Sequence, residues 1–197
     1  GALVQTDRVA YTQDLASSLS KVLQINDGTD RTNYIYGHER LLSDAAGGEW
    51  YATDALGSLR FTLNDDGLAT SGTTYDPFGQ RERGTIATFG FTGELQDANS
   101  DNVYLRARWY NPSHGAFMAQ DPFSGFDQQP YSLHPYQYGY SAPTTWTDPS
   151  GMCVHWIGDA VGQLFGNAPT SECKYQGWSN PNWEDGAALV EGVASNV

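Results

Sequence analysis

The stretch "YATDALGSLRFTLNDDG", residues 51–67, repeats an earlier part of the chain at an offset of 40 positions. The earlier copy begins "YTQDLASSL", residues 11–19, and shares its tyrosine, aspartate, serine and leucine at the same spacing. Both copies then reach an Asp-Gly pair, after a shift of one residue. Asp-Gly between runs of β-forming residues is typical of a hairpin turn. We expect each copy to form strand, tight turn, strand and hairpin turn, and a repeat of this period indicates stacked units that bury their faces against one another.

The composition favours short strands over long helices. The 197 residues are 39% hydrophobic and 13% aromatic, with 22 glycines and 9 prolines. Aromatic residues suit strands, and glycine and proline form turns. The sequence pattern predicts further strands at residues 32–36, 73–75, 89–93 and 102–110. The last segment alternates strictly, which puts Leu105 on one face and Arg106 and Arg108 on the other. We therefore predict a mainly β fold.

The pattern changes after Gly151. From His155 to Phe165 the apolar residues recur about every four positions, which predicts a helix that ends at the following Gly-Asn pair. We place a boundary here. Residues 1–152 are expected to form the β domain, and residues 153–197 a variable C-terminal tail that is short, helical and docked on the β part.

The tail contains the chain's two cysteines, Cys153 and Cys173. A disulfide between them would close a loop of about twenty residues and stabilise the fold by roughly 3 kcal/mol; two free thiols are the alternative. A metal site at these cysteines and His155 lacks a fourth ligand. The calcium-like spacing of the acidic residues at 97–101 lacks the glycine and glutamate of a calcium loop. We expect no metal and no other cofactor.

The charge limits the kinds of partner. The formal net charge is −13, whereas nucleic acids and anionic membrane surfaces are bound by basic faces. No run approaches the roughly 18 apolar residues that a membrane-spanning helix requires. We therefore expect no nucleic-acid partner and no membrane span.

Five phrases in a fixed order carry a family resemblance. They are "YATDALGSLRFTLNDDG" (51–67), "TYDPFGQ" (74–80), "FGFTGELQD" (89–97), "VYLRARWYNPSHGAFMAQDPF" (103–123) and "SLHPYQYGYSAPTTWTDPSG" (132–151). Together they resemble the RHS-repeat-associated core domain of the YD-repeat proteins, a group that includes RHS effectors, the C components of Tc toxins and teneurin-like proteins. The resemblance covers about residues 8–152. It implies a β-hairpin shell or spiral segment, the end of a hollow structure that encloses a C-terminal toxin in the large members.

The resemblance also implies a site. In many members this domain is an intramolecular aspartic protease that cuts just after its second Asp-Pro-x-Gly motif. The two motif aspartates fall on Asp121 and Asp148, and cleavage would lie between Met152 and Cys153. Two carboxyls held close together do not both ionise readily, so one can act as acid and the other as base. This chain departs from the family pattern in its first motif, Asp121-Pro-Phe-Ser-Gly125, which is one residue longer.

These observations predict a structural, extracellular β-shell module, secreted or at the cell surface. It would pair with the YD-repeat region of a longer chain, or with copies of itself in a larger assembly or filament, because exposed edge strands of a short repeat segment are adhesive. Self-cleavage through Asp121 and Asp148 is the alternative. A cell-surface adhesion module of the teneurin type is a second alternative.

Overall fold

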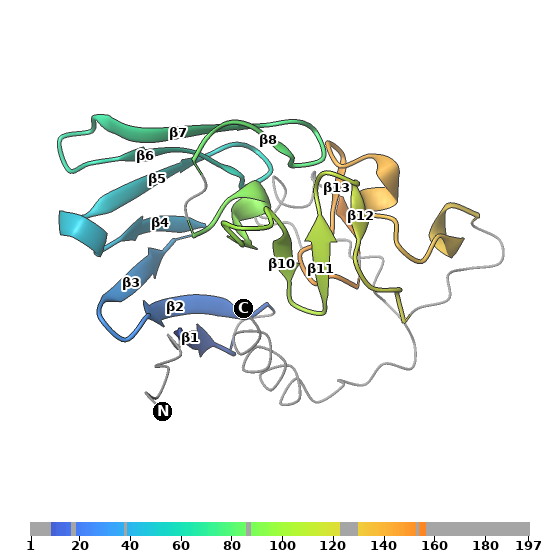
Figure 1. The fold of residues 1–197 in the computed structure, drawn as a ribbon, viewed down its shortest axis with the longest axis horizontal. Helices are drawn as coiled ribbons and strands as arrows, with labels where there is room; N and C mark the ends of the chain where they lie inside the picture. The colour runs from blue at the N-terminus through green and yellow to red at the C-terminus, as the bar shows by residue number, and fades with distance from the viewer. Residues whose placement is uncertain are drawn as a thin grey trace, which may run out of the picture. The chain divides into compact units, whose positions relative to one another are not determined.

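The computed structural model describes residues 9–16, 19–37, 39–85, 88–122, 130–152 and 154–156. The chain divides by its contacts into two units, residues 1–49 with 176–197 and residues 50–175. In both units the described residues form antiparallel strands joined by tight turns (Figure 1). The predicted mainly β fold is confirmed.

The first unit contains an antiparallel meander of four strands, drawn in blue shades in Figure 1. The elements are β1 (Ala10–Asp14), β2 (Lys21–Asn26), β3 (Arg31–Tyr36), β4 (Arg40–Ser43) and the 3-10 turn η1 (Ala45–Gly47). Tyr34 and Ser43 face each other across β3 and β4, and both are buried. Arg40 lies over the rings of Tyr34 and Tyr36, at 5.5 and 5.2 Å from their centroids. Cation–π contacts of this kind stabilise the packing of β3 against β4.

The second unit begins within β5 and contains two larger sheets and a short pair of strands (Figure 1). The first ladder consists of β5 (Glu49–Thr53), β6 (Leu59–Leu63), β7 (Ala69–Tyr75) and β8 (Arg81–Gly84). The second sheet has the order β12-β11-β10-β9 and consists of β9 (Leu95–Gln96), β10 (Val103–Leu105), β11 (Arg108–Asn111) and β12 (Ala116–Phe117). The remaining elements are the 3-10 turns η2 (Phe91–Gly93), η3 (Pro130–Leu133) and η4 (Gly139–Ser141), and the pair β13 (Trp146–Thr147) and β14 (His155–Trp156).

The internal repeat appears as two equivalent hairpins, β1–β2 and β5–β6. In each hairpin the register shifts at the residue before the shared aspartate, between Thr12 and Gln13 in one and between Ala52 and Thr53 in the other. A bulge of this kind bends the strand and increases its twist. The same defect, 40 residues apart, shows that the two hairpins are one structural unit used twice.

One five-residue turn recurs in the second unit. An Asp or Asn at its first position accepts hydrogen bonds from the backbone N–H groups two and four residues later, and a glycine with positive φ stands at its fourth position. The turns begin at Asp54, Asn64 and Asp76, with N···O distances of 2.9 to 3.1 Å. Such side chains replace the missing backbone partners of a tight turn. The sequence pattern Asp/Asn-x-x-Gly therefore determines where these strands reverse.

The core of the second unit is aromatic. The buried cluster consists of Tyr75, Phe91, Val103, Leu105, Tyr110, Phe117 and Tyr138. Tyr110 and Tyr138 stack with their centroids 4.2 Å apart. The Tyr110 hydroxyl donates to the Phe78 carbonyl at 2.6 Å, which ties this core to the turn at Asp76. Burial raises the pKa of both tyrosines, so their hydroxyls stay protonated.

The structure corrects three local predictions. Residues 102–110 are not one strand: β10 and β11 form a hairpin around Arg106 and Ala107. The turn shifts the alternation, so that Arg108 is buried on the same side as Leu105. Residues 91–93 form a 3-10 turn rather than a strand. His155 and Trp156 form β14 on β13 rather than the start of a helix. The rest of the predicted helix, Cys153 and Cys173 lie outside the described residues.

Two glycines at the same position of the recurrent turn provide a stability test. A Cβ on Gly79 would lie 2.4 Å from the buried ring of Phe91, whereas one on Gly67 would meet nothing within 4 Å; both have positive φ. G67A should cost about 1–2 kcal/mol for the backbone conformation alone. G79A should cost about 1–3 kcal/mol more because it overpacks the core. Urea unfolding of both variants measures the difference, and equal losses would contradict this account of the core.

Candidate functional site

The second Asp-Pro-x-Gly motif forms a variant of the recurrent turn, in which a hydroxyl contacts the aspartate from two residues later. Asp148 begins it, and its Oδ1 accepts from the Met152 N–H at 3.0 Å and from the Ser150 hydroxyl at 3.0 Å. The Gly151 N–H donates to the Asp148 carbonyl, and Gly151 has a φ of +70°. Asp148 is 2% exposed, unlike the acidic turn residues of the first ladder. This turn is therefore built into the interior.

The β10–β11 turn holds three successive carbonyls of this motif. Arg106 Nη1 donates to the Pro149 carbonyl, the Ala107 N–H donates to the Ser150 carbonyl at 3.2 Å, and Arg108 Nε donates to the Gly151 carbonyl. A Cβ on Gly151 would lie 2.3 Å from the Leu105 carbonyl oxygen. The turn therefore contacts backbone carbonyls of residues 149–151, which are present whatever side chains these residues carry. It leaves no room for a side chain at position 151.

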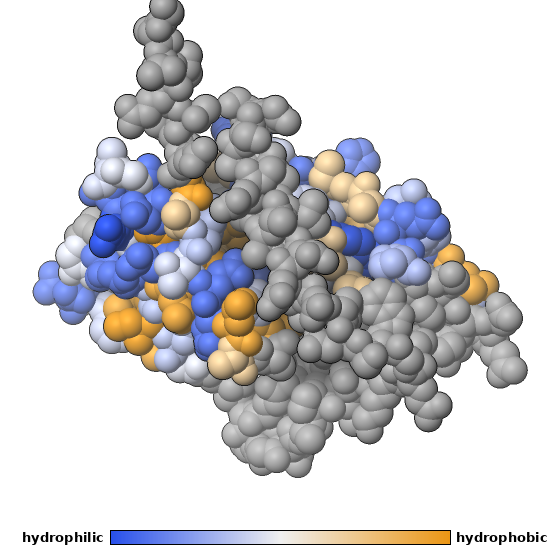
Figure 2. Space-filling model, turned by 90° about the horizontal axis from the view of Figure 1, so that it is seen from below, coloured by the Kyte–Doolittle hydropathy of each residue, from blue (hydrophilic) through white to orange (hydrophobic). Residues whose placement is uncertain are grey.

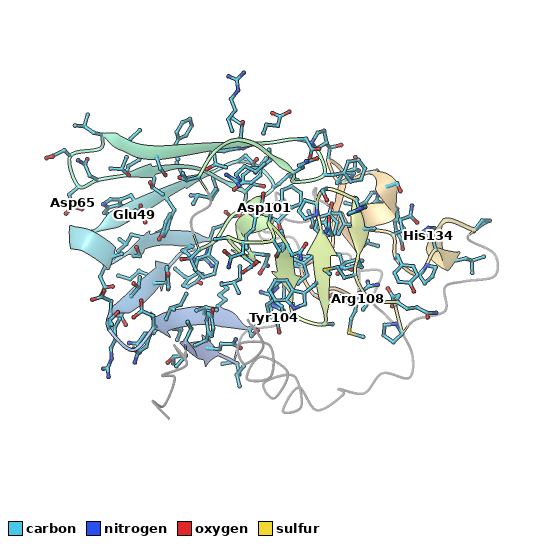
Figure 3. All side chains as sticks on the ribbon, in the orientation of Figure 1. Glu49, Asp65, Asp101, Tyr104, Arg108 and His134 are labelled. Atoms are coloured by element: carbon cyan, nitrogen blue, oxygen red, sulfur yellow. The ribbon has the colours of Figure 1, made fainter. Side chains whose placement is uncertain are left out.

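Arg108 connects this motif to the first one. Its Nη2 lies 2.8 Å from Asp121 Oδ2 and 3.5 Å from Asp148 Oδ2. Its Nη1 donates to the Pro135 carbonyl at 3.2 Å, and its guanidinium carbon lies 3.6 Å from the centroid of the Phe117 ring. Figure 3 labels this side chain on β11. Two aspartates 27 residues apart thus converge on one nitrogen of a buried arginine.

The electrostatics of the site depend on this one cation. Burial lowers the pKa of Arg108, while Asp121 and Asp148 act in the opposite direction. An arginine stays protonated in proteins, so the site holds a guanidinium between two carboxyl groups. A buried charge is tolerated when its hydrogen bonds are made and its charge is paired. Both conditions are met at Arg108.

The two carboxyl groups differ in their access to solvent. The Asp121 side chain is 17% exposed, whereas that of Asp148 is 3% exposed. The Asp121 N–H donates to the Pro135 carbonyl at 2.7 Å, the same residue whose carbonyl accepts from Arg108. Residues 123–129, which include the rest of the first motif, lie outside the described part of the chain. Of the pair, Asp121 is the carboxyl that water can reach.

The comparisons with known proteins identify the family. Residues 8–144 match the family model of the teneurin YD-shell, which is more than half of the chain. The chain belongs to the teneurin YD-shell family. The resemblance noted in its sequence motifs is thereby confirmed.

Relatives of this YD-shell segment are much longer proteins. The chain is 28% identical over 134 residues to the tRNA3(Ser)-specific nuclease WapA of Bacillus spizizenii, and the match covers 64% of this chain and 6% of that protein. It is 38% identical over 64 residues to toxin protein Tse5 of Pseudomonas aeruginosa, covering 32% and 5%. The crystal structure of TcdB2-TccC3 matches 73% of this chain and 8% of that chain with a TM-score of 0.54 and 17% identity, which shows the shared fold. The chain is thus a YD-shell module that spans less than a tenth of the length of these relatives.

The YD-shell geometry places the predicted residues together but adds one that the sequence analysis missed. We expected two carboxyls sharing a proton, and the structure puts Arg108 in contact with both. The strand prediction had placed Arg106 and Arg108 on the face opposite Leu105, and it gave neither arginine a role at the motif. The sequence did contain one signal for this role. Arg106 and Arg108 lie close to the two acidic motifs in a chain with only 10 Lys and Arg residues.

The acidic residues of the calcium-like loop make contacts within the protein. Asp97, in the calcium-like loop, accepts from the N–H and hydroxyl of Ser100, and Asp101 pairs with Arg81. Within the described ranges no three His, Cys, Asp or Glu side chains come together as a metal site would require. Those ranges also contain no helix with the length and apolar character to span a membrane.

Removing the central cation should destabilise the second unit strongly. R108M leaves Asp148 buried without its partner, and breaking a buried pair from one side typically costs about 3–5 kcal/mol. R81M is the matched control, because the Arg81 and Asp101 side chains are 31% and 37% exposed and such pairs contribute no more than about 1 kcal/mol. The free energy of unfolding in urea measures both. Similar losses for the two variants would contradict the role given to Arg108.

Proposed function

We propose that this YD-shell module cuts its own chain between Met152 and Cys153, using Asp121 and Asp148, and so separates the shell from the segment that follows it. The convergence of both motif aspartates on Arg108 carries the proposal. Both Oδ2 atoms lie near the same Nη2 atom of Arg108, at 2.8 and 3.5 Å, so the two carboxyl groups are neighbours. Met152, on the N-terminal side of the cut, is hydrogen-bonded through its N–H to Asp148.

The chemistry is that of an aspartic protease. A water molecule attacks the carbonyl carbon of Met152 while the carboxylate of Asp121, the more exposed of the two, takes its proton. In the reacting form Asp148 carries a proton, which it gives to the amide nitrogen of Cys153 as the C–N bond breaks, and it thereby returns to the ionised state that pairs with Arg108. Arg108 holds the two groups at a fixed separation and offsets the repulsion between them. Because the reacting bond is in the same chain, no binding step precedes the reaction.

Another turn of this chain suggests a substitution at Asp148 that removes the acid–base function and keeps the fold. Asn64 forms the same turn with its amide oxygen, so D148N should keep the turn and lose the acid–base function. D121N should likewise stop cleavage. D76N is the matched control, because Asp76 begins an Asp-Pro-x-Gly turn without a second aspartate among the contacts described here.

Intact-mass spectrometry of the purified chain over days measures the reaction. We expect two products, one ending at Met152 and one beginning at Cys153, in the unmodified protein and in D76N, with a loss of at least 100-fold in D148N and D121N. An unmodified chain that stays at full length throughout would refute the proposal. So would cleavage of D148N at the unmodified rate.

A second proposal concerns what pairs with β1. This strand lies at the end of its ladder, with β2 as its partner among the described residues. A strand edge is a template for pairing, and the chain spans only 5–6% of its longer relatives. We infer that a preceding YD-repeat hairpin of a longer, secreted or surface-displayed chain pairs here. In the isolated module, a second copy would take that place and give head-to-tail assemblies.

Self-association of the isolated module should therefore depend on concentration. Exposed apolar side chains such as Ile35 and Phe61, at 54% and 52%, add to the tendency; Figure 2 shows hydrophobic residues among hydrophilic ones on one face. Light scattering coupled to size exclusion should show a mass above that of the monomer, rising with concentration. A monodisperse monomer at high concentration would contradict the proposal of self-association.

A further inference from the structure

Arg106 occupies a backbone conformation that normally suits glycine. It is the first residue of the two-residue turn between Leu105 and Arg108, which pair across β10 and β11. Its φ is +57°, a region in which a side chain strains the backbone. Glycine would form this turn without that strain. The presence of arginine here calls for an account in terms of its side chain.

The Arg106 guanidinium links two segments far apart in the sequence. Nη1 donates to Glu94 Oε1 at 2.9 Å and also to the Pro149 carbonyl. The two paired side chains are only 15% and 18% exposed. Glu94 follows η2, whose Phe91 is a member of the aromatic core. The second motif is thereby tied, through one charged side chain, to the rigid centre of the unit.

We propose that Arg106 is a positioning residue for self-cleavage, and that the β10–β11 turn is the element that recognises Asp-Pro-x-Gly. The role in recognising the cleaved segment rests on the proposed function, whereas the contacts of Arg106 with the motif are independent of it. Arg106 fixes the carbonyl of residue 149, Ala107 that of residue 150 and Arg108 that of residue 151. These contacts set the direction in which the chain leaves the turn at Met152, toward the bond to be cut.

The same contacts determine which residues of the motif are selected. The first position must be acidic because its carboxyl meets the buried Arg108. The fourth must be glycine because the Leu105 carbonyl fills the space of a Cβ. The third position is contacted through its backbone carbonyl, and its hydroxyl donates to Asp148 Oδ1 and accepts from the Met152 N–H. We therefore expect G151A to lose cleavage.

The test compares R106G with T92G and R106K. R106G removes the guanidinium and relieves the backbone strain, whereas T92G relieves the same kind of strain at a residue with a φ of +51° and keeps the guanidinium. R106K keeps a positive charge and loses the second donor arm. Three readouts are taken on the full chain: the rate of cleavage, hydrogen exchange of peptides spanning residues 148–152, and the melting temperature.

For R106G we expect at least a tenfold faster exchange at residues 148–152 and a tenfold slower cleavage, with the melting temperature within about 4 °C of the unmodified chain. T92G should match the unmodified chain in exchange and cleavage, and R106K should lie between the unmodified chain and R106G. A purely structural Arg106 would give a large fall in melting temperature with exchange and cleavage at 148–152 unchanged, which would overturn the proposal. If the unmodified chain does not cleave at all, the proposed function fails, and the exchange data still decide whether Arg106 positions the turn.

Discussion

The buried guanidinium of Arg108 is the constraint on which the site depends. It is 5% exposed and contacts two carboxyl groups, two carbonyl oxygens and an aromatic ring. Taking such a cation out of water is costly unless each of these partners is in place. The requirement therefore works in both directions: the two motifs satisfy Arg108, and Arg108 fixes the two motifs. A neutral side chain at this position would leave Asp148 buried without a charge partner.

The site is built from a turn that the fold uses repeatedly. At Asn64 and Asp76 the Asp/Asn-x-x-Gly turn reverses the chain, and at Asp54 its Oδ2 also pairs with the partly exposed Arg60. At Asp148 the same turn is buried, and its second carboxyl oxygen lies near Arg108. The Asp148 turn thus differs from the other turns in the side chains that surround it rather than in its backbone conformation. The difference between Asp76 and Asp148 is the presence of the β10–β11 turn.

Local sequence patterns predicted what local contacts decide. The repeated hairpins and their Asp-Gly turns were predictable because each turn is stabilised within five residues. The β10–β11 hairpin was not, because the alternation from Val103 to Tyr110 continues through a turn whose first residue is an arginine with positive φ. The pairing of β14 with β13 was also missed, since it depends on partners eight to ten residues away. The convergence of Asp121 and Asp148 followed from the family resemblance, but the cation between them did not.

A double-mutant cycle between Arg108 and Asp148 tests the central claim most directly. The free energies of unfolding of R108M, D148N, the double variant and the unmodified chain give the coupling between the two side chains. The Asn64 turn indicates that asparagine preserves the backbone at this position, so the cycle isolates the ion pair. The account predicts a coupling of about 2 kcal/mol or more. A coupling near zero would contradict it, because Arg108 would then not hold the second motif.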